Sequence, residues 1–363
     1  MKIIRSTRVG RSLGRAAFAL LVSMAALLSG QVAQAADYKF PGNVPATCTG
    51  SGGSYTCGAL SLSLGDTITV GSATTLIVNG ALTMGSAVQV NAGGVASDLT
   101  FVVAGTTDIG ANCTVVANIV GTGVVTMGAF GKLTGNVATQ SAAINIGDFT
   151  VVDGSLQSTV AGVVNVGANS HVTGSVSTLS GAINIGANTV IDGSLTTALA
   201  GVISIGAGAS VGGNLSTVSG AINLGAASKV AGYLLNTIAG AITIGENSHV
   251  GGSVATNSGA ITLTAGTATG GSVCTGLAGA ITLNDNTSVG GNVRTNAGAI
   301  TVGSLSTVTG GVAAVVGAVT VATSAKVGTV IASIKCPFDP PGSYVAPKPP
   351  VIKSREWRQI FMR

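Results

Sequence analysis

The chain has few charged and few aromatic residues. Of its 363 residues, 7% are Asp, Glu, Lys or Arg, and 3% are Phe, Trp or Tyr. A compact globular domain uses more aromatic volume inside and more charge outside, so that class of fold is disfavoured. Disorder is disfavoured as well, because 46% of the residues are hydrophobic and disordered chains combine low hydrophobicity with high net charge.

The sequence also lacks a basic region that could bind nucleic acid. Five of the 16 basic residues and none of the 11 acidic residues lie within residues 1–35. Six more basic residues lie from Lys335 onward, which leaves five basic and nine acidic residues between these segments. Because no basic patch remains there to neutralise phosphates, nucleic acid is not an expected partner.

The first 35 residues have the features of an export signal. Five basic residues precede the apolar stretch AAFALLVSMAALLSG, and Ala33 and Ala35 follow in A-x-A spacing. This pattern predicts a secretory signal peptide over residues 1–35, cleaved near Ala35. The mature chain is then expected in the periplasm, on the cell surface or outside the cell, with no stable membrane span. An uncleaved membrane anchor is the alternative.

Cysteine is scarce, and proline is concentrated at one end. In an exported chain, Cys48 and Cys57, which bracket a Gly/Ser loop, predict a disulfide. Cys113 and Cys274 fall inside repeats and are expected to be small buried residues, and no C-x-x-C pair suggests zinc or redox chemistry. Six of the eight prolines lie in residues 337–363. We expect an extended linker there.

A phrase of the form apolar-x-apolar-Gly repeats through most of the chain. The phrase ends at Gly128, Gly147, Gly167, Gly186, Gly206, Gly225, Gly245, Thr264, Asn284, Gly303 and Ala322. Successive steps alternate between 19 and 20 residues as far as Gly303, and a final step of 19 breaks the alternation. The position three residues before each phrase alternates too, because Ser180, Ser219 and Ser258 interleave there with alanines. The repeating unit is therefore a pair of coils, 39 residues long.

The period within each coil is two, which is typical of strands. Ile183 and Ile185 are apolar and Asn184 between them is polar. Three short strands and their corners need about 19 residues, so the repeat predicts an all-β fold, a right-handed, three-sided parallel β-helix. We expect an N-terminal cap over residues 36–60, the β-helix over residues 61–336, and glycines at corners or at positive φ. A β-propeller is the runner-up, disfavoured because each 39-residue unit divides into two similar halves.

The sequence offers little that could perform catalysis. Asp153 and Asp192 occupy one column two coils apart, about 9–10 Å by strand spacing, near the separation of an inverting carboxylate pair. His171 and His249 lie 78 residues apart, too far to share a metal. No P-loop, HExxH or calcium-repeat motif is present. We therefore expect a non-enzymatic protein without cofactors, in which the two aspartates are solvated.

One outward column of small polar residues runs along the repeat. Its members are the middle residues of the repeated phrase, namely Asn145, Asn165, Asn184, Ser204, Asn223, Thr243, Thr262, Thr282, Thr301 and Thr320. Such side chains suit strands and can hydrogen-bond along a stack, so a structural role is sufficient to explain them. Lateral packing, sugar binding and ice binding are the functional alternatives for this surface ladder.

The last residues contain a short amphipathic pattern. Trp357, Ile360 and Phe361 are spaced i, i+3, i+4 and are flanked by arginines. A helix here would present an apolar face for docking to a partner. A disordered tail end is the alternative.

The region before the repeats carries a resemblance to a known family. YKFPGNVPATCTGSGGSYTCGALSLSLGDTITV (Tyr38–Val70) and NAGGVASDLTFVVAG (Asn91–Gly105) resemble the N-terminal β-helical region of MshQ-like proteins. That family serves biogenesis of the mannose-sensitive haemagglutinin type IV pilus. The resemblance covers residues 38–336. More distantly, the V-x-G-x-V coils resemble bactofilins, which are polymer-forming β-helices.

These observations together predict an exported, non-enzymatic structural or adhesive β-solenoid of the cell surface. The pilus resemblance implies a link to type IV pilus biogenesis. Its expected partners are other copies, other surface or pilus proteins, or glycans. The alternatives are a self-assembling bactofilin-like scaffold polymer, a β-helix that binds or cleaves polysaccharide, and an ice-binding protein.

Overall fold

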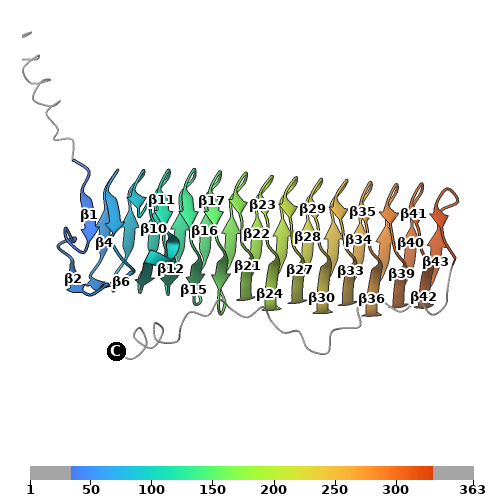
Figure 1. Ribbon diagram of the computed structural model, residues 1–363. Helices are drawn as coiled ribbons and strands as arrows, with labels where there is room; N and C mark the ends of the chain where they lie inside the picture. The colour runs from blue at the N-terminus through green and yellow to red at the C-terminus, as the bar shows by residue number, and fades with distance from the viewer. Residues whose placement is uncertain (1–33, 330–363) are drawn as a thin grey trace, which may run out of the picture. The chain divides into compact units, whose positions relative to one another are not determined.

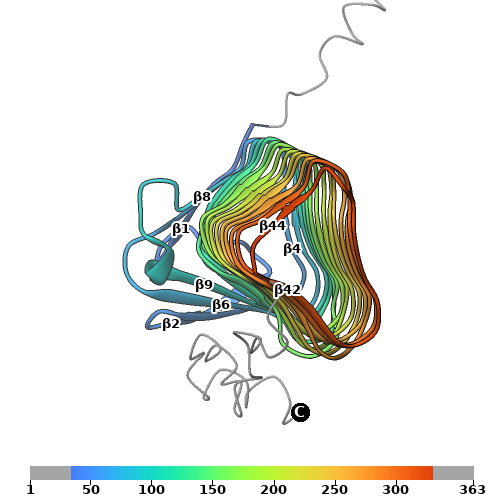
Figure 2. The same cartoon turned by 90° about the vertical axis from the view of Figure 1, so that its right-hand side faces the viewer.

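The structure is a computed structural model that describes residues 34–329. The predicted signal peptide, apart from its last two residues, and the predicted Pro-rich tail lie outside the described residues. Three parallel sheets, here called A, B and C, wind into a β-solenoid (Figure 1). The end-on view shows the coils stacked around three sides (Figure 2). The prediction of an all-β, three-sided parallel β-helix is confirmed.

Each sheet takes one short strand from every coil. Sheet A contains β1 Asp37–Phe40, β5 Thr67–Val70, β8 Gln89–Val90, β11 Thr114–Val116, β14 Lys132–Thr134, β17 Val151–Asp153, β20 His171–Val172, β23 Val190–Ile191, β26 Ser210–Val211, β29 Lys229–Val230, β32 His249–Val250, β35 Ala268–Thr269, β38 Ser288–Val289, β41 Thr307–Val308 and β44 Lys326–Val327. Sheet C contains β4 Leu60–Leu62, β7 Leu82–Met84, β10 Thr107–Ile109, β13 Val125–Met127, β16 Ile144–Ile146, β19 Val164–Val166, β22 Ile183–Ile185, β25 Ile203–Ile205, β28 Ile222–Leu224, β31 Ile242–Ile244, β34 Ile261–Leu263, β37 Ile281–Leu283, β40 Ile300–Val302 and β43 Val319–Val321.

Sheet B includes the one antiparallel pair, β2 with β3, among the strand pairs of the described residues. Its strands are β2 Cys48–Ser51, β3 Ser54–Cys57, β6 Thr74–Val78, β9 Leu99–Val103, β12 Asn118–Gly121, β15 Val137–Thr139, β18 Leu156–Ser158, β21 Val176–Ser180, β24 Leu195–Ala200, β27 Leu215–Ser219, β30 Leu234–Ala239, β33 Val254–Ser258, β36 Val273–Ala278, β39 Val293–Ala297 and β42 Val312–Val316. The one helix in the described range is a short 3-10 turn, η1 Ala96–Asp98.

The core consists of branched aliphatic residues stacked coil on coil. In sheet C, Ile183 and Ile185 are buried while Asn184 between them is exposed. Ile183 pairs in register with Val164 on one side and Ile203 on the other. Each inward side chain therefore contacts its equivalent about 4.8 Å away, which fills the interior without aromatic volume.

Buried hydroxyl groups satisfy backbone carbonyls at the corners. At the end of sheet B, Thr178 Oγ1 donates to the Gly181 carbonyl oxygen at 3.0 Å. At the corner between sheets C and A, Thr189 Oγ1 donates to the Gly167 carbonyl oxygen at 2.7 Å. These carbonyls lie outside the strands and accept from the hydroxyl groups instead. A buried acceptor without a partner would cost about 1–3 kcal/mol.

Glycine at the corner between sheets B and C is required by close approach of the coils. The column is Gly162, Gly181, Gly201, Gly220, Gly240, Gly259, Gly279, Gly298 and Gly317. A Cβ added at Gly201 would lie 2.0 Å from the Gly181 carbonyl oxygen. Gly206, in the repeated phrase, likewise lies close to the previous coil and not at left-handed φ. The expectation of corner glycines therefore holds for the column from Gly162 to Gly317. Close contact with the previous coil explains the glycines of the repeated phrase, such as Gly206.

The left-handed conformation falls two residues after the repeated phrase. Asn169, Asn188 and Asn247 have φ of 55–56°, and Asn is the residue that tolerates this region best after glycine. Phe130, Phe149, Ala227 and Leu305 occupy the same turn position in other coils. The turn therefore depends on its place in the coil and not on glycine.

The first coil, in the region expected as a cap, is closed by a hairpin. β1 pairs with β5, and β3 pairs with β6, so the region joins sheets A and B directly. Cys48 and Cys57, opposite each other in the hairpin, form the expected disulfide. Phe40 packs edge-on against Tyr55 with ring centroids 4.8 Å apart. These contacts cover the N-terminal end of the core.

The last described coil is more exposed than the coils before it. Val319 and Val321 of β43 occupy inward columns, yet they are 37% and 38% exposed, whereas Ile300 and Val302 of the preceding coil are 0% and 1% exposed. No described coil follows them. The two ends therefore differ in how far the core is covered.

Candidate functional site

The surface ladder is the most regular feature of the outer surface. All ten predicted members lie in sheet C in unbroken register, from Asn145 paired with Asn165 to Thr301 paired with Thr320. The same column extends towards the N-terminus through four residues that the repeat did not predict, Ser61, Thr83, Asp108 and Thr126. The column thus runs through all 14 strands of sheet C.

Side chains within the ladder bind one another. Asn165 Nδ2 donates to Asn145 Oδ1 at 2.7 Å, and Asn184 Nδ2 donates to Asn165 Oδ1 at 2.8 Å. Small residues flank the column on the same face, as Ala182 and Gly186 do beside Asn184. The outward surface of sheet C, here called the C face, is therefore flat and nearly uncharged.

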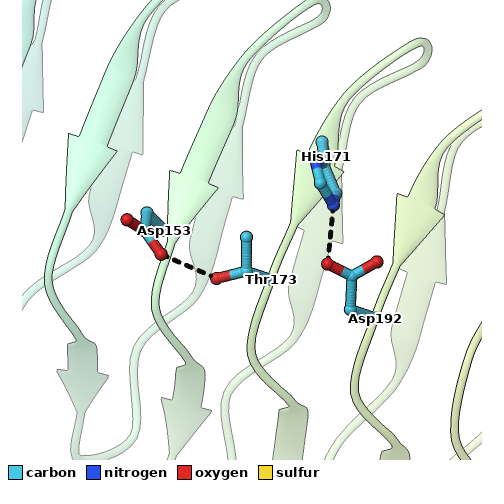
Figure 3. A network of polar contacts seen from close by, with 4 residues as sticks. All are labelled: Asp153, His171, Thr173 and Asp192. Carbon is cyan, nitrogen blue, oxygen red and sulfur yellow. Dashed lines mark hydrogen bonds and ion pairs between the residues drawn. The ribbon is translucent and has the colours of Figure 1, made fainter.

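The candidate carboxylates lie on sheet A, and each binds the neighbouring coil (Figure 3). Asp153 Oδ1 accepts a hydrogen bond from Thr173 Oγ1 at 3.0 Å. Asp192 Oδ2 lies 2.9 Å from His171 Nε2. Figure 3 shows Thr173 between the two carboxylates, so they do not face one another across an open space. The arrangement is that of exposed side chains joined between coils, where an ion pair contributes about 0–1 kcal/mol.

The histidines do not form a metal centre. His171 and His249 lie in the same outward column of sheet A, separated by the strands β23, β26 and β29. Within residues 34–329, no group of three His, Cys, Asp or Glu side chains is placed to hold a metal ion. The contact of His171 with Asp192 was not predicted, although the sequence places the two residues on adjacent coils.

Two stacked phenylalanines stand at the corner between sheets C and A. Phe130 and Phe149 are exposed, and their ring centroids lie 5.0 Å apart with an interplanar angle of 5°. Both residues have positive φ, 59° and 55°. Stacking contributes about 0.5–1.5 kcal/mol, which offsets part of the cost of the left-handed conformation, about 1–2 kcal/mol at each of the two residues. The signal for the pair was a Phe two residues after Gly128 and Gly147.

Cys113 and Cys274 are buried, as predicted. Cys113 is free, and its Sγ donates to the Gly85 carbonyl oxygen at 3.0 Å. Burial raises the pKa of the Cys113 thiol. Cys274 is disulfide-bonded and packs with Leu235 and Ala255 on the outer side of sheet B.

Alternate coils expose one large aliphatic residue that sequence reasoning did not identify. These residues are Val160, Leu199, Ile238 and Leu277. Their spacing of 39 residues equals the two-coil unit. The alternation of 19 and 20 residues was the available signal for these exposed residues, because each 20-residue coil must accommodate one residue more than its 19-residue neighbours.

The predicted docking residues Trp357, Ile360 and Phe361 lie outside the described residues. Within residues 34–329, no helix is both long enough and apolar enough to cross a membrane. No protein-family model, curated protein or solved structure matches the chain.

Proposed function

We propose that the chain is an exported, non-enzymatic structural rod of the cell surface that contributes to adhesion. The observation that carries the proposal is the unbroken register of the C face through all 14 strands of its sheet. Such a face, about 60 Å long at about 4.8 Å per coil, suits extended contact along another surface. The link to type IV pilus biogenesis rests on the resemblance of residues 38–70 and 91–105.

The polar contacts on sheet A support a structural role over a polysaccharide-cleaving one. Inverting glycosidases leave a space of about 6.5–9.5 Å between two carboxyl groups for the attacking water. Here Thr173 contacts Asp153, and His171 contacts Asp192. Turnover of a glycan panel by the wild type, lost in Asp153→Asn/Asp192→Asn, would overturn the non-enzymatic role. A glycan that binds without turnover would make the chain a glycan-binding adhesin.

The exposed valines of the last described coil favour a second candidate, a self-assembling scaffold polymer. Exposed Val319 and Val321 leave the core of the last described coil partly uncovered, and unpaired strand edges recruit other strands. Electron microscopy of the purified exported chain tests this candidate. Concentration-dependent filaments in the wild type that disappear in Val319→Lys/Val321→Lys would replace the single rod with the polymer.

Ice binding finds less support in the C face. The face offers one column made mostly of Asn, Ser and Thr, with mainly alanine and glycine beside it, and not paired rows of threonine. Thermal hysteresis of the purified chain measures this activity directly. Its absence removes the ice-binding candidate, and a clear hysteresis gap lost in Thr262→Lys would establish it.

The proposed role is tested in the native host with an epitope-tagged full-length chain. We expect antibody to label intact cells, the mature N-terminus to begin near Ala36, and deletion of the chain to reduce surface attachment. Tag confined to the cytosol, or attachment unchanged by deletion, would contradict the proposed role. Pilus counts on the deletion strain separate a pilus-linked role from direct adhesion.

A further inference from the structure

The extra residue of the longer coils forms a bulge at the corner between sheets B and C. Thr178 pairs with Thr197 and Ser180 with Ala200, so a single residue in one coil faces two in the next. The same register shift recurs at β24 with β27, β27 with β30, and β33 with β36. A β-bulge leaves its extra residue unpaired and re-aims the side chain.

Leu199, Ile238 and Leu277 lie in the bulges of β24, β30 and β36, and Val160 lies at the same corner 39 residues before Leu199. Val160, Leu199, Ile238 and Leu277, here called the bulge row, are between 42% and 63% exposed. Single exposed hydrophobic residues need no explanation, but apolar groups gathered along one edge mark interaction sites. Recurrence at one corner in four longer coils is not a scatter of single residues.

In the coils between these bulges, the side chains at the same corner project less. Leu179 and Val218 are only partly exposed there, and Ser180 and Ser219 follow them. The bulge row therefore alternates with shallow positions, with projecting residues about 9.6 Å apart, which is twice the strand spacing. A partner surface fits the whole row only if it has the same period.

A second copy of the chain has that period by construction. Two identical faces can pack together only if they bring few like charges into contact. Asp108 is the one charged residue among the outward ladder positions of the C face beside the row. Two such faces bring few like charges together. In contrast, outward positions of sheet A carry Lys132, Asp153, Lys229 and Lys326.

The surface is large enough for a stable pair. The C face with the bulge row is about 60 Å long and about five residues wide, which gives about 1,000 Å² per copy. Stable interfaces bury about 800 Å² per partner. The bulge row alone would be too small, so the flat face and the row are needed together.

We propose that the bulge row and the C face form the contact between two copies of this chain, packed side by side and antiparallel. A two-fold arrangement is self-complementary, so the projecting residues of each copy enter the shallow positions of the other. This pairing rests on the proposed structural role only in that it names the chain's partner. Dimer formation is measured on purified protein, so its outcome does not depend on export or on cell attachment.

Sedimentation velocity of the purified full-length exported chain tests the pairing from about 1 to about 100 μM, the range of modest protein affinities. We expect a concentration-dependent dimer. The variant Leu199→Ser/Ile238→Ser/Leu277→Ser should raise the dissociation constant at least about 100-fold, because it removes the central apolar contacts. All three side chains point outward at a bulge, so circular dichroism should show an unchanged fold.

The matched control is Val151→Ser/Val190→Ser. These valines are 39% and 40% exposed and also lie 39 residues apart, but they belong to sheet A. The control should dimerise like the wild type. A wild type that stays monomeric throughout, a bulge-row variant that dimerises normally, or a control that loses the dimer equally would overturn the proposal. Open-ended assemblies would overturn the two-fold arrangement.

Discussion

Replacing Gly201 with alanine tests the packing of the coils most severely. An ideal Cβ at this position lies 2.0 Å from the Gly181 carbonyl oxygen, whereas ordinary contact begins at 3.4 Å. The φ of Gly201 is outside the left-handed range, so the cost is steric and not conformational. To admit the methyl group, the two coils must separate locally by about 1.4 Å, because cores lack spare volume.

That separation breaks hydrogen bonds between the coils. The Gly181 N–H donates to the Ala200 carbonyl at 2.9 Å, and Thr217 Oγ1 donates to the Gly201 carbonyl at 3.2 Å. Overpacking costs about 1–3 kcal/mol, and each buried group left without a partner costs about 1–3 kcal/mol more. We therefore expect Gly201→Ala to lower the free energy of unfolding by about 4 kcal/mol.

Urea unfolding followed by far-UV circular dichroism measures this loss against a matched control. Gly93 has no atom within 4 Å of an added Cβ and no left-handed φ, so Gly93→Ala makes the same chemical change in open space. The control should be neutral, or stabilising by about 0.4–1 kcal/mol through the unfolded chain. Unfolding curves for the two variants that agree within about 1 kcal/mol would refute the proposed close approach of the coils.

Three further changes follow from single residues. Leu305, 68% exposed with a φ of 59°, should gain about 1 kcal/mol of stability when replaced by asparagine, because asparagine tolerates the left-handed region; a lower melting temperature would contradict this. Asn165→Ala should cost about 1 kcal/mol, because it removes hydrogen bonds to both neighbours in the ladder; an unchanged urea midpoint would show that the ladder does not stabilise the stack. Native Cys113 should resist iodoacetamide at pH 8 and react after unfolding, because burial raises the pKa of its thiol. Since the folded pKa exceeds the unfolded value of 9.0, this group's contribution to stability is complete below pH 9 and declines as the pH rises further; equal labelling of folded and unfolded protein at pH 8 would contradict its burial.

The repeat predicted much of the fold because each coil meets its own equivalent. The alternation of Ile183, Asn184 and Ile185 was enough to assign the inside and outside of sheet C, and a fixed step then placed every equivalent residue in register. Cys48 and Cys57 could be paired because they bracket a Gly/Ser loop in a chain predicted to be exported. Local period and repeat length were sufficient for these features.

Other features depend on contacts between coils that a repeat length does not contain. The extra residue of a longer coil could sit at any of three corners, and only the register shift at Thr197 and Ala200 shows that Leu199 turns outward. The contact of His171 with Asp192 depends on the side-chain directions at two different positions of adjacent coils. Whether an exposed column meets water or a partner is likewise a property of surfaces, which the core does not determine.

The structural role is tested most directly by complementing a deletion strain and counting the attached cells. Two variants with equal surface levels are compared, Asp153→Asn/Asp192→Asn and Leu199→Ser/Ile238→Ser/Leu277→Ser. A rod that acts by packing predicts that the first variant restores attachment to the wild-type level and the second does not. Restoration by the bulge-row variant together with failure of the aspartate variant would contradict that role.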